Sequence, residues 1–571
     1  MQTAPPTTIE RIPPQAYSSL QAAVSAGHLT FDRLYLPRPR VWVAFILVTY
    51  LALGSLYALR TPDWQAPDEP AHYNNIAHIA QTGTLPVLKM GDYNQELLDF
   101  LLYTHFAPKV PTLPLRYEAY QPPLYYVLAT PIYWLTQGNL LALRFFNLLL
   151  GALGLWLLYA GVATVFPNKT LISGGALAFA ALLPMQIAVA AAVNNDVLAQ
   201  VMVVGAMYVL LRWMRTQFHG TAALDSRQST MSLILLGFLL GLGMVTKIYA
   251  YLVLPVAVAT VVLVAWLRPR VGRPLRGLEW SKLRRSLAPA LWVVAPALTL
   301  ALPLWVRNIS LYGRWDIMGL RWHDAVVSGQ PTTAEWIARF GLPDYMERAL
   351  SYTFQSFWGV FGWMGVFMDS RVYTALLVFT GVLFLGVLWA VVRMISGPPD
   401  TDMDLFQTSV LMLFGLLLLG VTASYLWYNM KFVQHQGRYF FWGMLPISVV
   451  VALGWREVLY PFQGLITGLL AGVLALAIAM AGVINHTMDK WTVLTVGLTS
   501  LFLLLQPILL SGYNPYIMAR LTPQMRRRLQ HGPVDVGLDI MRTLAWALPF
   551  VLLALVNLSV VLRLIPQQLG R

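Results

Sequence analysis

The sequence predicts an all-α protein that crosses a membrane many times, because its composition and its long apolar segments suit a lipid environment. Of its 571 residues, 57% are hydrophobic and 11% are charged, and the mean hydropathy is +0.61. Soluble domains are less apolar and carry about 25% charged residues. Apolar stretches of roughly 17 to 25 residues can each span roughly 30 Å of hydrocarbon as a helix. We expect about thirteen such helices, near residues 41–59, 139–166, 171–193, 197–214, 231–246, 249–267, 288–306, 373–396, 406–428, 440–454, 461–484, 491–511 and 543–565.

The positions of Lys and Arg predict the orientation of these helices. Segment 268–286 carries seven Lys and Arg residues against one Glu, and Arg520 and residues 526–528 form a second basic stretch. Short cytoplasmic loops are enriched in Lys and Arg, so both stretches predict a cytoplasmic N-terminus. The net charge of +14 is then loop charge that faces anionic lipid, and no nucleic-acid partner is needed to explain it.

The N-terminal segment 1–40 predicts a disordered cytoplasmic tail, since it is polar and contains several prolines. It lacks the basic start and immediate apolar run of a signal peptide. The chain has no cysteine. Disulfides, thiolate catalysis and Cys-ligated metals are therefore excluded.

Two predicted outer loops, 60–138 and 307–371, are too long to be simple connectors. In the first loop, EPAHYNNIAHIAQTG has apolar residues at helical spacing and ends at Gly83, which predicts a surface helix. QELLDFLLYTHF (95–106) predicts a second surface helix. PPLYYVLATPIYWL (122–135) is apolar but short and rich in Tyr, which indicates an interfacial or re-entrant helix.

The stretch APDEPAHY (66–73) places two adjacent carboxylates, Asp68 and Glu69, and His72 just beyond the first membrane helix. One interpretation is structural: Asp68 caps the following helix, and Glu69 complements the helix dipole. A capping carboxylate can also act in catalysis. A metal site of Asp68, Glu69 and His72 is a further alternative, because their spacing allows a shared helix face. No second Glu-x-x-His accompanies it, so we expect no metal cofactor.

The motif PDEPAHY after the first helix, followed by YQPPLYY (120–126), resembles the GT-C superfamily of polytopic glycosyltransferases. The sequence is most similar to the protein mannosyltransferase-like branch, which includes aminoarabinose transferases, and to a bacterial family that shares the PDEPAH signature. The resemblance extends over residues 41 to about 450. It continues in VNNDVLAQ (193–200), TKIYAYLVLP (246–255), VRNISLYG (306–313), FWGVFGWMG (357–365) and QGRYFFWGMLP (436–446).

The resemblance implies a sugar donor linked to a polyprenyl phosphate, and a general base at Asp68 with Glu69 beside it. Phosphate is a good leaving group, so the enzyme must chiefly deprotonate the acceptor and neutralise the departing phosphate. The pKa of an ordinary Asp is about 3.9. We expect the neighbouring Glu69 and the low-dielectric membrane surface to raise the pKa of Asp68. One base without a covalent intermediate predicts inversion at the anomeric carbon.

Cations at the outer helix ends are candidates for binding the donor phosphate, namely Lys247, Arg307 and Arg438. Each could instead be an interfacial anchor, as we expect for Arg144. Asp196 follows two asparagines and could belong to a helix–helix turn. Further candidates for substrate binding are His72, Gln121, Asp196, His435 and Tyr439.

The predicted organisation is a tail at 1–40, a GT-C-like catalytic membrane domain at 41–455 and further membrane helices at 456–571. The expected function is hexosyl or pentosyl transfer to an unknown acceptor, at the extracytoplasmic face of a bacterial cytoplasmic membrane. Two alternatives stay open. A polysaccharide polymerase or ligase of the O-antigen type is suggested by cations of the second loop, which are Arg314, Arg321, His323, Arg339 and Arg348. A lipid or solute transporter would need broken helices near mid-bilayer and an internal repeat.

Overall fold

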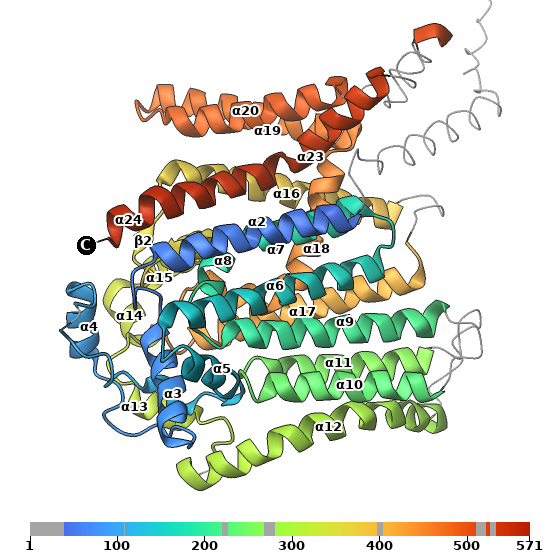
Figure 1. Cartoon of the computed structure of the whole chain (residues 1–571). Helices are drawn as coiled ribbons and strands as arrows, with labels where there is room; N and C mark the ends of the chain where they lie inside the picture. The colour runs from blue at the N-terminus through green and yellow to red at the C-terminus, as the bar shows by residue number, and fades with distance from the viewer. Residues whose placement is uncertain are drawn as a thin grey trace, which may run out of the picture. The chain divides into compact units, whose positions relative to one another are not determined.

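The computed structural model describes residues 39–107, 109–219, 226–267, 280–313, 315–396, 403–509, 521–525 and 533–570. Residues 1–38 of the predicted tail, residues 268–279 of the basic segment 268–286, and the arginines at 520 and 526–528 therefore lie outside the described residues. Figure 1 shows a molecule built almost entirely of helices.

Ten helical segments within the described residues are long and apolar enough to cross a membrane. They are α2 (Pro39–Arg60), α6 (Leu140–Val165), α9 (Asp196–His219), α10 (Ser226–Met244), α12 (Trp280–Tyr312), α16 (Ser370–Ser396), α17 (Leu405–Asn429), the 3₁₀-helix η3 (Gly437–Gly443) with α18 (Met444–Val458), α19 (Pro461–Ile484), and α23 (Pro533–Ser559) with η5 (Val560–Leu564) and α24 (Ile565–Gln568). The protein is thus a multi-pass membrane protein, and the all-α prediction is confirmed.

The predicted number of thirteen membrane helices is not confirmed. The segment predicted at 171–193 is a pair of helices, α7 (Thr170–Leu182) and α8 (Pro184–Ala190), bent by 61°. Pro184 has no N–H to donate, and the preceding Leu183 is extended, as residues before proline prefer. Two further predicted segments lie in α11 (Ala250–Leu267) and α20 (Lys490–Leu509). Their apolar parts, Ala250–Trp266 and Lys490–Gln506, are shorter than the ten membrane-length segments.

The chain divides into two compact units. Of the described residues, the smaller unit contains those within Leu377–Val392 and Leu453–Leu548. There, α19 packs closely on α20 along glycines spaced four residues apart, which are Gly464, Gly468 and Gly472. Ser500 Oγ donates to the Gly468 carbonyl at 2.7 Å. Small residues let membrane helices approach each other in this way.

The larger unit comprises Arg40–Leu376, Arg393–Ala452 and Pro549–Arg571, and it contains both long loops. All three predicted surface helices of the first loop are present, as α3 (Glu69–Thr82), α4 (Gln95–Tyr103) and α5 (Leu124–Leu135), with a short 3₁₀-helix η1 (Tyr117–Tyr120) before α5. The second loop forms α13 (Leu320–Val326), α14 (Thr333–Phe340), α15 (Leu342–Trp358) and an antiparallel hairpin of β1 (Val360–Phe361) and β2 (Val366–Phe367). Within this unit, Figure 1 shows the short helices of the two loops gathered beyond one end of the long ones.

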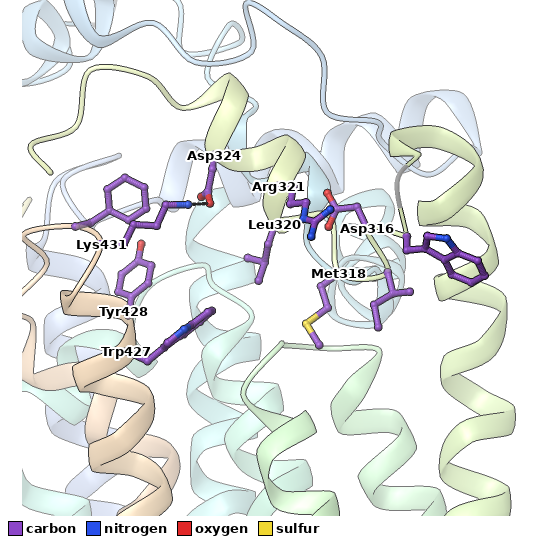
Figure 2. Close-up of a pocket in the computed structure, with 11 residues that line it drawn as sticks. Asp316, Met318, Leu320, Arg321, Asp324, Trp427, Tyr428 and Lys431 are labelled. Carbon is purple, nitrogen blue, oxygen red and sulfur yellow. Dashed lines mark hydrogen bonds and ion pairs between the residues drawn. The ribbon is translucent and has the colours of Figure 1, made fainter.

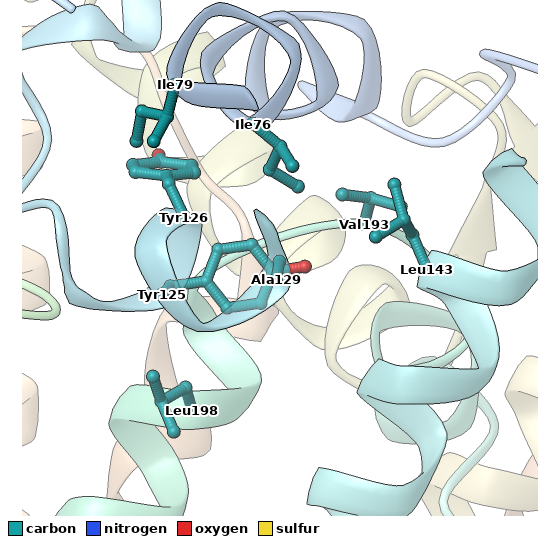
Figure 3. Packing of buried hydrophobic residues seen from close by; sticks show 8 residues of the cluster. All are labelled: Ile76, Ile79, Tyr125, Tyr126, Ala129, Leu143, Val193 and Leu198. Atoms are coloured by element: carbon teal, nitrogen blue, oxygen red, sulfur yellow. The ribbon is translucent and has the colours of Figure 1, made fainter. Parts of the chain in front are cut away.

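A buried apolar cluster fixes α3 on α5. Ile76 and Ile79 on α3 pack toward Tyr125 and Tyr126 on α5, and Leu143, Val193 and Leu198 complete the cluster (Figure 3). Burying such side chains stabilises a fold by about 1.5–3 kcal/mol each. Because α3 begins directly after Asp68, this packing holds the PDEPAHY motif in place.

Candidate active site

Asp68 directly precedes α3, in the N-cap position, but its backbone is in the left-handed region with a φ of 65°. Cβ crowds the backbone in this region, and Asp and Asn adopt it more often than other residues with a side chain. The carboxylate makes no capping hydrogen bond to the described N–H groups of α3. The prediction of a side-chain cap is therefore wrong. Backbone strain of this kind clusters at functional sites.

The Asp68 carboxylate instead accepts one hydrogen bond on each oxygen. Tyr117 donates its hydroxyl to Oδ1 at 2.8 Å, and Arg438 Nη2 donates to Oδ2 at 3.0 Å. Burial by itself would raise the pKa of Asp68, but the charge of Arg438 and these hydrogen bonds outweigh it and lower the pKa. The prediction of a raised pKa is wrong, because Asp68 faces a cation.

Glu69 turns away from Asp68 into a buried ion pair. Arg144 donates to both of its carboxylate oxygens, at 2.8 and 2.6 Å, and the Val193 N–H donates at 3.1 Å. Arg144 also donates to the carbonyls of Ala58, Thr61 and Pro62. The prediction of Arg144 as an interfacial anchor is wrong, because the side chain is buried and links α6 to the end of α2 and the start of α3. The contacts of Glu69 are those of a structural group.

A second ion pair joins segments predicted separately as candidates. Lys247 Nζ lies 2.9 Å from Asp196 Oδ1 and donates to Asn195 Oδ1, also at 2.9 Å. Asn195 donates in turn to Gln121 Oε1 at 3.2 Å. The neighbouring Asn194 makes the turn contacts expected of this motif, since its Nδ2 donates to the Val189 carbonyl at 2.7 Å.

His72 lies within the electrostatic field of both pairs. The pKa of His72 is lowered to about 3. Burial is the largest cause, and the charges of Lys247 and Arg438 act in the same direction, whereas those of Asp68 and Asp196 raise the pKa. The imidazole is therefore neutral at physiological pH. Its Nδ1 lies 2.8 Å from the Tyr126 hydroxyl. Asp68, His72, Asp196, Lys247 and Arg438 thus form one cluster, which we call the acidic–basic cluster.

Glu118 is a site residue that the sequence reasoning missed. It lies in η1, next to Tyr117, and its side chain is buried. Its Oε2 has no hydrogen-bond partner among the described residues. Burial raises its pKa, and the negative charge of Asp68 raises it further. The sequence signal was its place three residues before Gln121 in YEAYQPP.

The remaining candidates lie in different surroundings. Arg307 Nη2 donates to the Pro86 carbonyl at 2.6 Å and Nη1 to Asn308 Oδ1 at 3.3 Å, so the described contacts do not link it to the acidic–basic cluster. His435 is buried, lies edge-on to Tyr345, and has no hydrogen-bond partner on either ring nitrogen in the part of the chain that the structure describes. The Tyr439 ring lies 5.8 Å from the Arg438 guanidinium.

Helix α15 packs against the backbone next to Arg438. The Gly437 N–H donates to Ser356 Oγ at 2.8 Å, and Arg438 Nε donates to Gln436 Oε1 at 2.6 Å. A side chain at position 437 would collide with the backbone of Phe357 and with the Thr353 carbonyl. Only glycine lets η3 approach α15 this closely.

Two cavities adjoin this region. A narrow one of about 40 Å³ has Arg438 in its wall, together with apolar residues of α2 and α8. A wider one of about 380 Å³ lies between α13 and the end of α17, and Figure 2 shows the residues that line it. Within the described residues, Asp68, Glu69 and His72 do not form a group that could hold a metal ion, and neither do any other three His, Asp or Glu side chains.

Fold and site together define a multi-pass membrane protein whose ionisable groups collect at helix ends and in short loop helices. Residues 120–299 match the family model described as dolichyl-phosphate-mannose-protein mannosyltransferase. This match confirms, over that segment, the resemblance to the protein mannosyltransferase-like part of the GT-C superfamily. A comparison with curated proteins gave no match.

Three solved structures are similar to this chain at low identity. The oligosaccharyltransferase of Archaeoglobus fulgidus, tethered with an acceptor peptide, is 14% identical with a TM-score of 0.45, over 87% of this chain and 59% of the archaeal one. In its apo form, 56% of that enzyme's chain is covered, so this chain spans less than two thirds of its length. ArnT from Cupriavidus metallidurans bound to undecaprenyl phosphate is 16% identical with a TM-score of 0.40, over 90% of this chain and 76% of ArnT.

Proposed function

We propose that the protein is a glycosyltransferase that moves a sugar from a polyprenyl phosphate to an acceptor hydroxyl or amine, with Asp68 as the general base. One observation carries the proposal: the Asp68 carboxylate, at a left-handed position before α3, lies 3.0 Å from Arg438 Nη2, and Lys247 lies in the same cluster. The site thus combines a proton acceptor with two cations that suit a phosphate. The family match to a mannosyltransferase that takes its sugar from dolichyl phosphate supports the donor class.

The reaction follows from these groups. The acceptor oxygen or nitrogen forms a bond to the anomeric carbon, while the bond from that carbon to the phosphate oxygen breaks. The electron pair leaves on the phosphate, which Arg438 and Lys247 stabilise, and the acceptor proton passes to Asp68. A single displacement of this kind inverts the anomeric configuration.

The low pKa of Asp68 suits a base that is activated by its substrate. In the free protein, Arg438 lies against Asp68 and lowers the pKa of the carboxyl. A donor phosphate competes for the guanidinium and brings its own negative charge. Both effects raise the pKa of Asp68, so the carboxylate becomes a stronger base once the donor is bound. Glu69 is a positioning residue in this scheme, because Arg144 occupies its carboxylate.

The remaining polar groups would orient the sugar. Asn195 and Asp196 contact Lys247, and Gln121 accepts a hydrogen bond from Asn195. Burial and the charge of Asp68 raise the pKa of the Glu118 carboxyl, which favours its protonated form, and a protonated carboxyl can donate a hydrogen bond to a sugar hydroxyl. We further propose that this region faces the extracytoplasmic side of the cytoplasmic membrane, on the basis of the basic stretches 268–286 and 520–528.

The test is to incubate the purified protein with a panel of labelled polyprenyl-phosphate sugars and to compare wild type with Asp68→Asn. Loss of the base lowers transfer or hydrolysis by about 10²- to 10⁴-fold. Asp63→Asn, an exposed residue of the same loop, is the matched control and retains activity. Equal activity of wild type and Asp68→Asn would reject Asp68 as the base. A wild-type protein inactive on every donor would reject the donor class.

A further inference from the structure

The wider cavity has a mixed lining that the proposed chemistry does not use. Its volume is about 380 Å³, near the lower end of the range of about 300–1,000 Å³ for small-molecule sites. Trp315, Trp427 and Phe432 supply aromatic surfaces to it. Figure 2 shows the Lys431–Asp324 ion pair on one side and Arg321 beside Asp316 on the other.

This lining selects among ligand classes. A polyprenyl tail needs an apolar groove and gains nothing from four charged side chains. A phosphate suits Arg321 and Lys431 but is repelled by Asp316 and Asp324. A neutral sugar ring fits both parts of the lining, since its C–H face packs on an indole and its hydroxyls both donate to carboxylates and accept from cations.

Two chains of contacts lead from the cavity, one to Arg438 of the acidic–basic cluster and one toward Glu118. On one side, its wall residue Tyr428 packs edge-on against Tyr439, next to Arg438, with ring centroids 5.6 Å apart. On the other side, Asp324 lies 3.2 Å from His323 Nδ1, whose ring is 4.4 Å from that of Tyr120, two residues from Glu118.

We propose that this cavity is a carbohydrate subsite, in which Trp427 or Trp315 packs against a sugar ring and Asp324 and Lys431 bind its hydroxyls. The inference rests on the proposed function, because it assigns a sugar-binding role to a cavity whose lining residue Tyr428 connects through Tyr439 to Arg438. The ring belongs either to the donor sugar or to a glycan acceptor. Both have the same chemistry, and the experiment separates them.

The experiment measures kcat and KM of the purified full chain with polyprenyl phosphates that carry different hexoses and pentoses. The variants are Trp427→Ala and Asp324→Asn. The control is Trp292→Ala, an exposed tryptophan of α12 that lies outside both cavities. The cavity variants raise KM by roughly tenfold and change the ranking of the sugars, because lost sugar contacts discriminate between substrates by about this factor. Binding of sugar-free polyprenyl phosphate stays within about twofold of wild type.

Two arms identify the source of the ring. If it is the donor sugar, the variants slow donor hydrolysis in the absence of an acceptor. If it is a glycan acceptor, hydrolysis is unchanged and only transfer to an added glycan is slowed. The proposal is overturned if the cavity variants behave like Trp292→Ala, or if they weaken sugar-free polyprenyl phosphate and all donors equally.

A second measurement keeps this inference distinct from the proposed function. If wild type acts on none of the donors, binding of methyl glycosides to the full chain is followed by saturation-transfer NMR. Binding that disappears in Trp427→Ala supports a carbohydrate subsite even though the transferase proposal has failed. Absence of binding to wild type for every glycoside overturns the subsite as well.

Discussion

Asp68 and Glu69 are adjacent in sequence, yet they belong to two different kinds of ion pair. The Glu69 side chain is 0% exposed, and Arg144 and a backbone N–H satisfy it on several sides. The Asp68 side chain is 27% exposed and accepts a hydrogen bond from one guanidinium nitrogen of Arg438. The first pair connects α2, α3 and α6, whereas the second lies at the edge of a cavity.

Burial and the number of hydrogen bonds decide which of the two carboxylates is able to react. A buried pair with saturated hydrogen bonds loses several kcal/mol when a partner leaves, so it remains closed. A partly exposed pair with one shared hydrogen bond can exchange its cation for an incoming phosphate at lower cost than a fully buried pair. The two carboxylates therefore have different roles, which their partners determine. Glu69 and Arg144 form a structural ion pair, here called the brace, and Asp68 and Arg438 form the reactive pair.

The largest effect is expected for Glu69→Gln, which breaks the brace. Arg144 would remain buried without its counter-charge, and such a loss costs about 3–5 kcal/mol of folding stability. We expect a large fall in the thermal unfolding temperature of the detergent-purified protein and a low yield. Glu96→Gln, an exposed position on α4, should change stability by no more than about 0.5 kcal/mol. A stable but inactive Glu69→Gln protein would instead make Glu69 a catalytic residue.

Arg438→Gln tests the reactive pair. Losing one phosphate-binding donor should lower kcat/KM by about 10²- to 10³-fold. It also removes the cation that lowers the pKa of Asp68, so that pKa rises. Because the base must be ionised, the acid limb of the pH profile of kcat/KM moves to higher pH in the variant. Arg307 donates to the Pro86 carbonyl and not to Asp68, so Arg307→Gln should leave the acid limb of the pH profile in place. An unchanged limb in Arg438→Gln would show that Asp68 does not titrate in it.

The sequence was sufficient for the elements and insufficient for their pairing. Apolar length predicted the ten membrane-length helices of the described residues but also three segments that are bent or shorter, and helical spacing predicted α3, α4 and α5. Which cation meets which carboxylate depends on contacts between distant segments, such as Asp68 with Arg438, which are 370 residues apart. No local pattern encodes that choice, so the sequence indicates an interfacial anchor at Arg144 where the fold forms a buried ion pair with Glu69.

Two other features were also beyond sequence reasoning. The left-handed backbone of Asp68 could not be anticipated, because Asp followed by Glu and Pro reads as an ordinary helix start. Glu118 was overlooked because it lies among tyrosines and prolines, and only the folded chain shows that its carboxyl is buried close to Asp68.

Gly437→Ala should loosen the reactive pair without removing any of its groups. The new methyl group collides with the backbone of Phe357, and relieving such a clash costs about 1–3 kcal/mol. The adjoining Arg438 shifts, so affinity for sugar-free polyprenyl phosphate falls along with activity. Gly415→Ala is the control, since a Cβ there meets no described atom within 4 Å, and it should stabilise α17 slightly. Equal lipid affinity in the two variants would mean that α15 does not position Arg438.

The smallest effect concerns His72, which follows Asp68 by four residues and is neutral in the folded protein. Its pKa is lowered to about 3, whereas an unfolded histidine titrates near about 6.5. Between these values the unfolded state binds the extra proton, so stability falls with decreasing pH by about 1.4 kcal/mol per pH unit for this one group. His72→Gln should remove that part of the slope between pH 7 and pH 5, measured as the unfolding temperature in detergent. His105→Asn, at an exposed position with a φ of 49° that Asn tolerates, should retain the slope. If His72→Gln retains it as well, the histidine is already protonated in the fold, and the cluster carries one more positive charge than the reactive pair is proposed to need.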